Sequence, residues 1–251
     1  MSNCVLFYGA ICKQRRHYMI QKESKHYIFN YNKNTLAEKD IDLIISFQER
    51  CFEHITSVLK TTPSTKINYY LCETPEEVGE LVGCEPNNGI ACFPNTIYAV
   101  YNETAQCIGF HEDAHIIAYH INNPENSAIH EGLAMYFDRQ WWGINNWDWT
   151  LYYIQQGKYV GIDQLLQENI FDNTDCAISY PILGTFVDWL ISTYGIDKFV
   201  EWYKCEELSS TAQEVYKFTT KELNEKFVGY VKMFFLDEAI QDRINQLLAG
   251  N

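Results

Sequence analysis

The sequence lacks several features that would assign it to large classes of protein. No stretch approaches the roughly eighteen uninterrupted apolar residues of a membrane-spanning helix. Basic residues are scarce: 19 Lys and Arg against 33 Asp and Glu give a formal net charge of −14, which opposes nonspecific attraction to nucleic acid or anionic lipid. No internal repeat or low-complexity tract is present. We therefore expect neither a nucleic-acid partner nor a membrane partner.

Export signals and disulfide patterns are missing as well. The amino terminus has no basic residue ahead of its short apolar run, and so does not resemble a secretory signal. The nine cysteines form an odd set without a CxxC pair, and their spacing supports no structural zinc site. Free thiols in a reducing compartment are the better interpretation. These features predict a soluble, cytoplasmic protein.

The residues that are present indicate one domain of the α+β class. Apolar residues make up 47% of the chain, enough for a substantial core. Short apolar stretches predict strands at 26–32, 66–72 and 96–101, and apolar spacing predicts a long helix over 37–60. Beyond Gly143 the patterns are mostly helical. We expect a single domain, 1–251, with a small amino-terminal mixed sheet and its helices in a lobe at 1–122 and a helical lobe at 123–251.

The most informative motif is His-Glu-Asp-Ala-His at 111–115. On a helix expected from about 103 to 120, His111 and His115 project from one face one turn apart, a geometry that suits two ligands on one tetrahedral metal. Glu112 can reach a zinc-activated water as general base. Asp113 lies off that face, and we expect only solvation for it.

A third ligand is available on the next predicted helix, over 128–140. Catalytic zinc takes three protein ligands and keeps one position open, and Glu131 fills the third place. The sequence therefore predicts one Zn²⁺ per chain held by His111, His115 and Glu131. The alternative is a chance motif in which both histidines are ordinary helix residues and Glu131 is a surface carboxylate.

With these residues in place, the chain resembles the gluzincin metallopeptidases, the thermolysin-like group of the peptidase MA clan, and in particular small peptidase-MA-like proteins. The resemblance rests on the strand at 96–101 before the motif helix, Glu-Gly-Leu-Ala at 131–134, and the run at 179–195. It implies a zincin-like catalytic domain. It also implies that the strand before the metal helix pairs with an extended substrate, a role that would fall to Ile97, Tyr98, Ala99, Val100 and Tyr101.

The resemblance also suggests two supporting residues. The thermolysin pattern has an aspartate one turn after the glutamate ligand; that position is Met135 here, and Asp138 is the available substitute, either as support for a ligand or as a solvated carboxylate. Tyr180 is the candidate donor to the oxyanion, against the alternative of a packed tyrosine. His120 and His130 are not expected to be ligands. The aromatic cluster could line a substrate pocket or belong to the core, with the core favoured: Trp141, Trp142, Trp147, Trp149, Tyr152 and Tyr153.

These observations predict a zinc-dependent peptidase that acts on a peptide or protein substrate, with Glu112 as general base. Two alternatives stay open: a zinc-binding but inactive peptidase-like protein with a binding or regulatory role, and a helical interaction module with an accidental motif. The absence of a Gly-x-Met-Glu-Asn motif slightly favours endopeptidase or oligopeptidase over aminopeptidase activity. The sequence does not indicate an oligomeric state.

Overall fold

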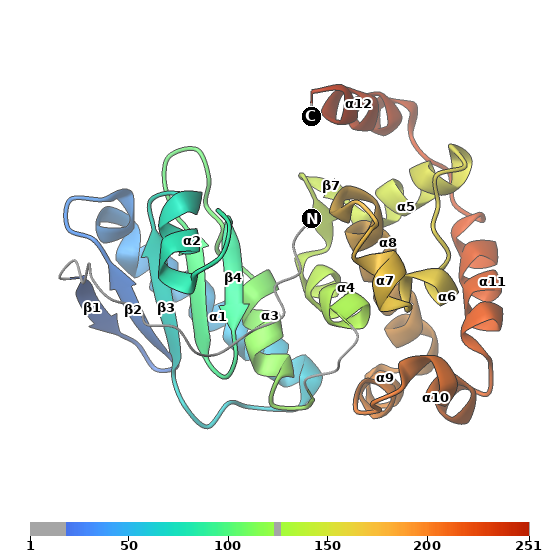
Figure 1. Ribbon diagram of the computed structural model, residues 1–251, viewed down its shortest axis with the longest axis horizontal. Coiled ribbons are helices and arrows are strands. Elements are labelled where there is room, and N and C mark those ends of the chain that lie inside the picture. Colours follow the sequence, from blue (N-terminus) through green and yellow to red (C-terminus); the bar gives the residue numbers. More distant parts are fainter. Residues whose placement is uncertain (1–18, 123–126, 251) are drawn as a thin grey trace. The chain divides into compact units, whose positions relative to one another are not determined.

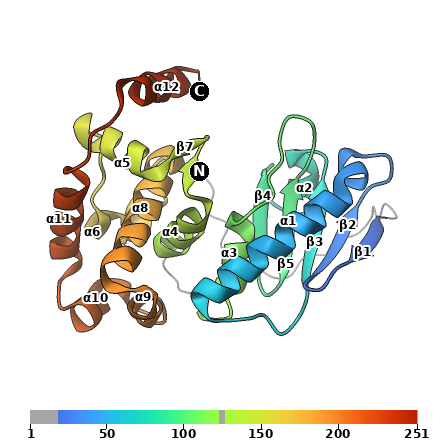
Figure 2. The same ribbon diagram turned by 180° about the vertical axis from the view of Figure 1, so that it is seen from behind.

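The computed structural model describes residues 19–122 and 127–250 (Figures 1 and 2). The chain divides into two compact units, residues 1–120 and 121–251, called here the sheet unit and the helical unit. The predicted α+β class is confirmed: a mixed sheet comes first and helices dominate the rest. The expectations for the amino-terminal segment and for Cys4 and Cys12 concern positions outside the described residues.

The sheet unit contains a five-stranded sheet in the order β1-β2-β3-β5-β4. Its three inner strands, β2 (Tyr27–Tyr31), β3 (Ile67–Cys72) and β5 (Thr96–Val100), run parallel to one another. The outer strands, β1 (Ile20–Glu23) and β4 (Gly89–Cys92), are each antiparallel to their neighbour. Strand β5 is therefore paired along both of its sides, and β4 forms the edge of the sheet beside it.

Helices cover both faces of this sheet. The long α1 (Leu36–Leu59) lies on one face, and α2 (Pro75–Val82) lies on the other (Figures 1 and 2). The alternation of strand residues explains the two layers. Tyr27, Phe29 and Tyr69 are fully buried against one another on the α1 side, and Cys72 and Val100 pack with the helix α2 on the opposite side.

Helices α1 and α2 each begin at a threonine that caps the first turn. The Thr35 side chain accepts a hydrogen bond from the Glu38 amide at the start of α1, and Thr74 does the same for Glu77 at the start of α2.

The motif helix α3 (His111–Ala118) packs against α1 and beside β4. It begins eight residues later than predicted, because the Asn102 side chain accepts hydrogen bonds from the Thr104 and Ala105 amides and holds this segment in a turn.

The helical unit is built around α8 (Cys176–Tyr194), which packs against α4 (Ser127–Asp138) and α5 (Asn146–Gln155). A two-stranded hairpin, β6 (Gln140–Trp141) and β7 (Ile144–Asn145), connects α4 to α5. The other helices of the unit are α6 (Ile162–Leu165), α7 (Glu168–Phe171), α9 (Ile196–Tyr203), α10 (Leu208–Tyr216), α11 (Thr220–Val231) and α12 (Glu238–Ala249).

Helices α4 and α8 approach each other closely because each has a glycine at the place where it contacts the other helix. A Cβ at Gly184 of α8 would lie 2.6 Å from the Cβ of Met135, and one at Gly132 of α4 would lie 3.0 Å from the Val187 side chain. Of the helices in the described residues, α8 is the one long and apolar enough to cross a bilayer, but 61% of its apolar window is buried inside the protein. Its composition is thus accounted for by its place in the core of the helical unit.

Candidate metal centre

The two motif histidines lie one turn apart on α3, as the spacing predicts. Their ring centroids are 4.9 Å apart and the rings are nearly perpendicular, at 85°. His115 is buried, with 6% of its surface exposed, whereas His111 is half-buried. Glu112, in the first turn, favours this helix because an acidic side chain lies there at the positive end of the helix.

The third predicted ligand, Glu131, lies in the first half of α4 and is half-buried. His111 and His115 belong to the sheet unit and Glu131 to the helical unit, so the completion of the ligand set by Glu131 stays a prediction. Two imidazole nitrogens and one carboxylate oxygen are donors that zinc accepts, so the donor chemistry fits zinc.

Glu112 lies between the two histidines in sequence and is half-buried. Its carboxylate lies along the backbone of Gly89 in the edge strand β4. The general-base candidate thus lies beside a strand that is not among those predicted from the sequence. The only sequence signal for β4 is the short apolar stretch Gly-Ile-Ala-Cys, which is too short for a pattern of alternation to be recognised.

Asp113 corrects the expectation of a solvated residue. It is fully buried. Its Oδ2 accepts a hydrogen bond of 2.5 Å from the Tyr27 hydroxyl and one of 3.0 Å from Gln48 Nε2. The Tyr27 hydroxyl also lies 3.1 Å from the Gln48 carbonyl oxygen, and Gln48 Nε2 donates to the Gly109 carbonyl oxygen. Asp113 therefore ties α3 to β2 and α1 through side chains that come from distant parts of the sequence.

The surroundings of Asp113 shift the pKa values of the buried groups. Burial raises the pKa of the Asp113 carboxyl well above its ordinary value, with a further contribution from the negative charge of Glu112, and the hydrogen bonds from Tyr27 and Gln48 only partly offset this. Burial likewise raises the pKa values of Tyr27 and Tyr69, assisted by the nearby Asp113. The interior behind the motif helix is therefore a medium that disfavours charge.

The strand expected to pair with a substrate does not have an unpaired side. Ile97, Tyr98 and Ala99 are in register with β3 on one side and with β4 on the other. Val100 pairs with β3, and its amide donates to the Asn88 carbonyl oxygen at 2.8 Å. Tyr101 forms a bridge with Gln106. The main-chain groups of Ile97, Tyr98 and Ala99 are thus used within the sheet, which leaves no side of this stretch for main-chain pairing with a substrate. A substrate-binding role for residues 97–101 stays a prediction. The sheet edge next to it belongs to β4.

Both supporting candidates lie in the helical unit. Tyr180 is half-buried on α8, with its ring 5.5 Å from that of Trp141 and parallel to that of Phe171 at 6.3 Å. Asp138 is the half-buried last residue of α4. Their roles as oxyanion donor and ligand support stay predictions. His130, not expected to be a ligand, has its Nδ1 2.6 Å from the Tyr203 hydroxyl.

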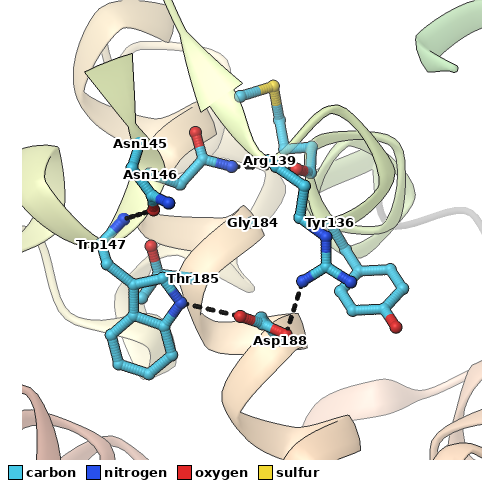
Figure 3. A pocket seen from close by; sticks show the side chains of 9 residues that line it. Tyr136, Arg139, Asn145, Asn146, Trp147, Gly184, Thr185 and Asp188 are labelled. Carbon is cyan, nitrogen blue, oxygen red and sulfur yellow. Dashed lines mark hydrogen bonds and ion pairs between the residues drawn. The ribbon is translucent and has the colours of Figure 1, made fainter.

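The aromatic cluster separates into core and surface residues. Trp149, Tyr152 and Tyr153 are buried, as favoured from the sequence, but Trp142 is 40% exposed. Trp147 lines a cavity of about 170 Å³ between α4, α5 and α8 (Figure 3). There Asp188 accepts hydrogen bonds from Trp147 Nε1 at 2.7 Å and from Arg139 Nη1 at 2.8 Å. This cavity is not lined by the candidate metal-site residues His111, Glu112, His115 and Glu131.

The sequence matches no protein-family profile, and no curated protein sequence matches it significantly.

Proposed function

We propose that the protein is a zinc-dependent peptidase in which His111, His115 and Glu131 hold one Zn²⁺ and Glu112 is the general base. The observation that carries this proposal is the pair of histidines one turn apart on α3, with ring centroids 4.9 Å apart and Glu112 next to the first of them in the same helical turn. A bound zinc ion would polarise the substrate carbonyl and lower the pKa of water to about 7.

The chain's own residues would carry the proton transfers. Glu112 accepts a proton from the attacking water and later delivers it to the departing amine, so one carboxylate serves first as base and then as acid. Tyr180 is the candidate that donates a hydrogen bond to the oxyanion, and Asp138 is the candidate that orients a ligand. Electrostatic interactions are stronger in buried surroundings than in water. His115 lies in such buried surroundings.

The proposed substrate is a peptide or protein chain. Strand β4 forms the edge of the sheet beside α3, and main-chain pairing of a peptide with an edge strand gives affinity with little sequence preference. We further propose a cytoplasmic location, supported by four cysteines that are thiols, Cys72, Cys107, Cys176 and Cys205. The net charge of −14 supports neither nucleic acid nor anionic membrane as partner.

Metal content and turnover test the proposal together. The wild-type protein, purified without chelators, is analysed for zinc by elemental mass spectrometry and then incubated with a diverse peptide library read by mass spectrometry. We expect one zinc per chain and cleavage that Glu112→Gln abolishes while zinc is retained. One zinc per chain without cleavage of any peptide would favour the inactive, zinc-binding alternative. No zinc after titration would refute the metal site.

A further inference from the structure

Gly89, in the edge strand β4, has no backbone reason to be glycine. It pairs with Ala99 in regular antiparallel register, and it is not among the glycines of the described residues that have a positive φ. Glycine inside a strand lowers stability relative to residues with side chains, because it loses more conformational freedom on folding. Glycine at such a position marks a close approach by another group.

The approaching group is the side chain of Glu112. A Cβ at Gly89 would lie 2.8 Å from Glu112 Oε1, 3.4 Å from its Cδ and 3.6 Å from its Cγ. The three distances show that the end of the Glu112 side chain lies along the face of β4 where a side chain of residue 89 would project. An ordinary contact starts at 3.4 Å, so the carboxylate oxygen would have to move by about 0.6 Å to admit a Cβ.

The strand itself is less able to move than the carboxylate. The Gly89 amide donates to Asn87 Oδ1 at 3.1 Å, and the Val100 amide donates to the Asn88 carbonyl oxygen at 2.8 Å. Ile90, the next residue, packs on the opposite face with the α2 core. Main-chain pairing and this apolar contact hold β4 in place, so an added side chain at residue 89 would displace the flexible end of Glu112.

We propose that Gly89 is a positioning residue for Glu112: the missing side chain sets where the carboxylate lies against the edge strand. The inference rests on the proposed function, in which that carboxylate moves the proton. A displacement approaching 1 Å in a catalytic group can lower turnover by about 100-fold. Gly89→Ala should therefore impair the proton-transfer step without removing any metal ligand.

A metal-independent measurement tests the contact. In the apoprotein labelled with ¹³C at glutamate side-chain carboxyl carbons, the Glu112 resonance is assigned by its loss in Glu112→Gln. We expect Gly89→Ala to shift this resonance. The matched control is Gly229→Ala on α11, where an added Cβ meets nothing within 4 Å, and it should leave the Glu112 resonance unchanged. An unmoved resonance in Gly89→Ala would overturn the inference whether or not the protein binds zinc.

Enzyme kinetics then test whether displacing the Glu112 carboxylate lowers turnover. We expect Gly89→Ala to lower kcat by about 10- to 100-fold with KM within about twofold and unchanged zinc content, and to shift the acidic limb of the pH–rate profile. A shifted resonance with unchanged kcat would overturn the positioning role. A shifted resonance in a protein that binds no zinc would support the contact and refute the proposed function instead. If Gly89→Ala fails to fold, the double variant with Glu112→Ala should fold; failure of both would overturn the inference.

Discussion

The Tyr27 hydroxyl donates a 2.5 Å hydrogen bond to Asp113 Oδ2 in the interior of the sheet unit, joining the first parallel strand to the motif helix. Both side chains are fully buried. Gln48 of α1 donates to the same oxygen, so three elements meet at one carboxyl group. These hydrogen bonds connect α3, on which His111 and His115 lie, to β2 and α1.

Removing the Asp113 carboxyl should destabilise the protein. Asp113→Ala leaves the Tyr27 hydroxyl and the Gln48 amide buried with fewer partners, and we expect a loss of about 2–4 kcal/mol in the free energy of unfolding. Asp113→Asn keeps one carbonyl oxygen for both donors and should cost less. Urea unfolding of the apoprotein measures both variants. An alanine variant as stable as wild type would show that the network contributes little.

Zinc binding should depend on His115 and not on His120. His115→Ala removes one of three protein ligands, and we expect the zinc content of the purified protein to fall from one per chain to near zero. His120→Ala is the matched control, because His120 is exposed and lies beyond the end of α3. Elemental mass spectrometry provides the readout. Equal zinc in wild type and His115→Ala would remove His115 from the ligand set.

The contact between α4 and α8 should not tolerate a side chain at Gly184. An alanine Cβ would lie 2.6 Å from the Met135 Cβ and 3.2 Å from the Met135 carbonyl carbon, so parts of a helix would have to shift. We expect Gly184→Ala to lower the free energy of unfolding by about 1–3 kcal/mol. Gly229→Ala, made in open space on α11, should not lower it. Thermal and urea unfolding compare the two; equal stability of both variants would contradict the close packing.

Acid should weaken the link between α1 and the β1–β2 turn. Burial alone raises the pKa of Glu49, but hydrogen bonds from Ser24 and from the amide and ring of His26 outweigh it and hold this pKa below its ordinary value of 4.5. Because the folded pKa is lower than the unfolded one, the stabilisation is present above about pH 4.5 and is lost as the pH falls through the folded value.

Urea unfolding of wild type and Glu49→Gln between pH 7 and pH 3 measures this effect. We expect the stability difference to be largest near neutrality and to shrink below about pH 4.5. Glu53→Gln, which changes an exposed residue of the same helix, is the matched control. A difference that stays constant over the whole range would rule out the assigned hydrogen-bonded carboxylate.

Much of the fold could be predicted because its signals are local. The apolar spacing over 37–60 corresponds to α1, and the stretch at 66–72 corresponds to β3. The histidine spacing likewise predicts a shared helix face, because helical geometry alone relates residues four apart. The start of α3 was predicted too early, since the turn at Asn102 depends on side-chain hydrogen bonds that compete with the helix.

Tertiary structure alone decided how the strands pair and what Asp113 contacts. Strand β5 carries a clear strand pattern, but whether its sides are paired depends on β4, four residues with almost no local signal. From the sequence, Asp113 is expected to be a solvated helix residue. In the structure it is buried and hydrogen-bonded to Tyr27, which lies 86 positions away in the sequence. Helix geometry relates residues that are close in the chain, so the sequence by itself determined that His111 and His115 share a helix face. Sheet order and burial arise from contacts between distant segments, and only the folded chain brings those segments together.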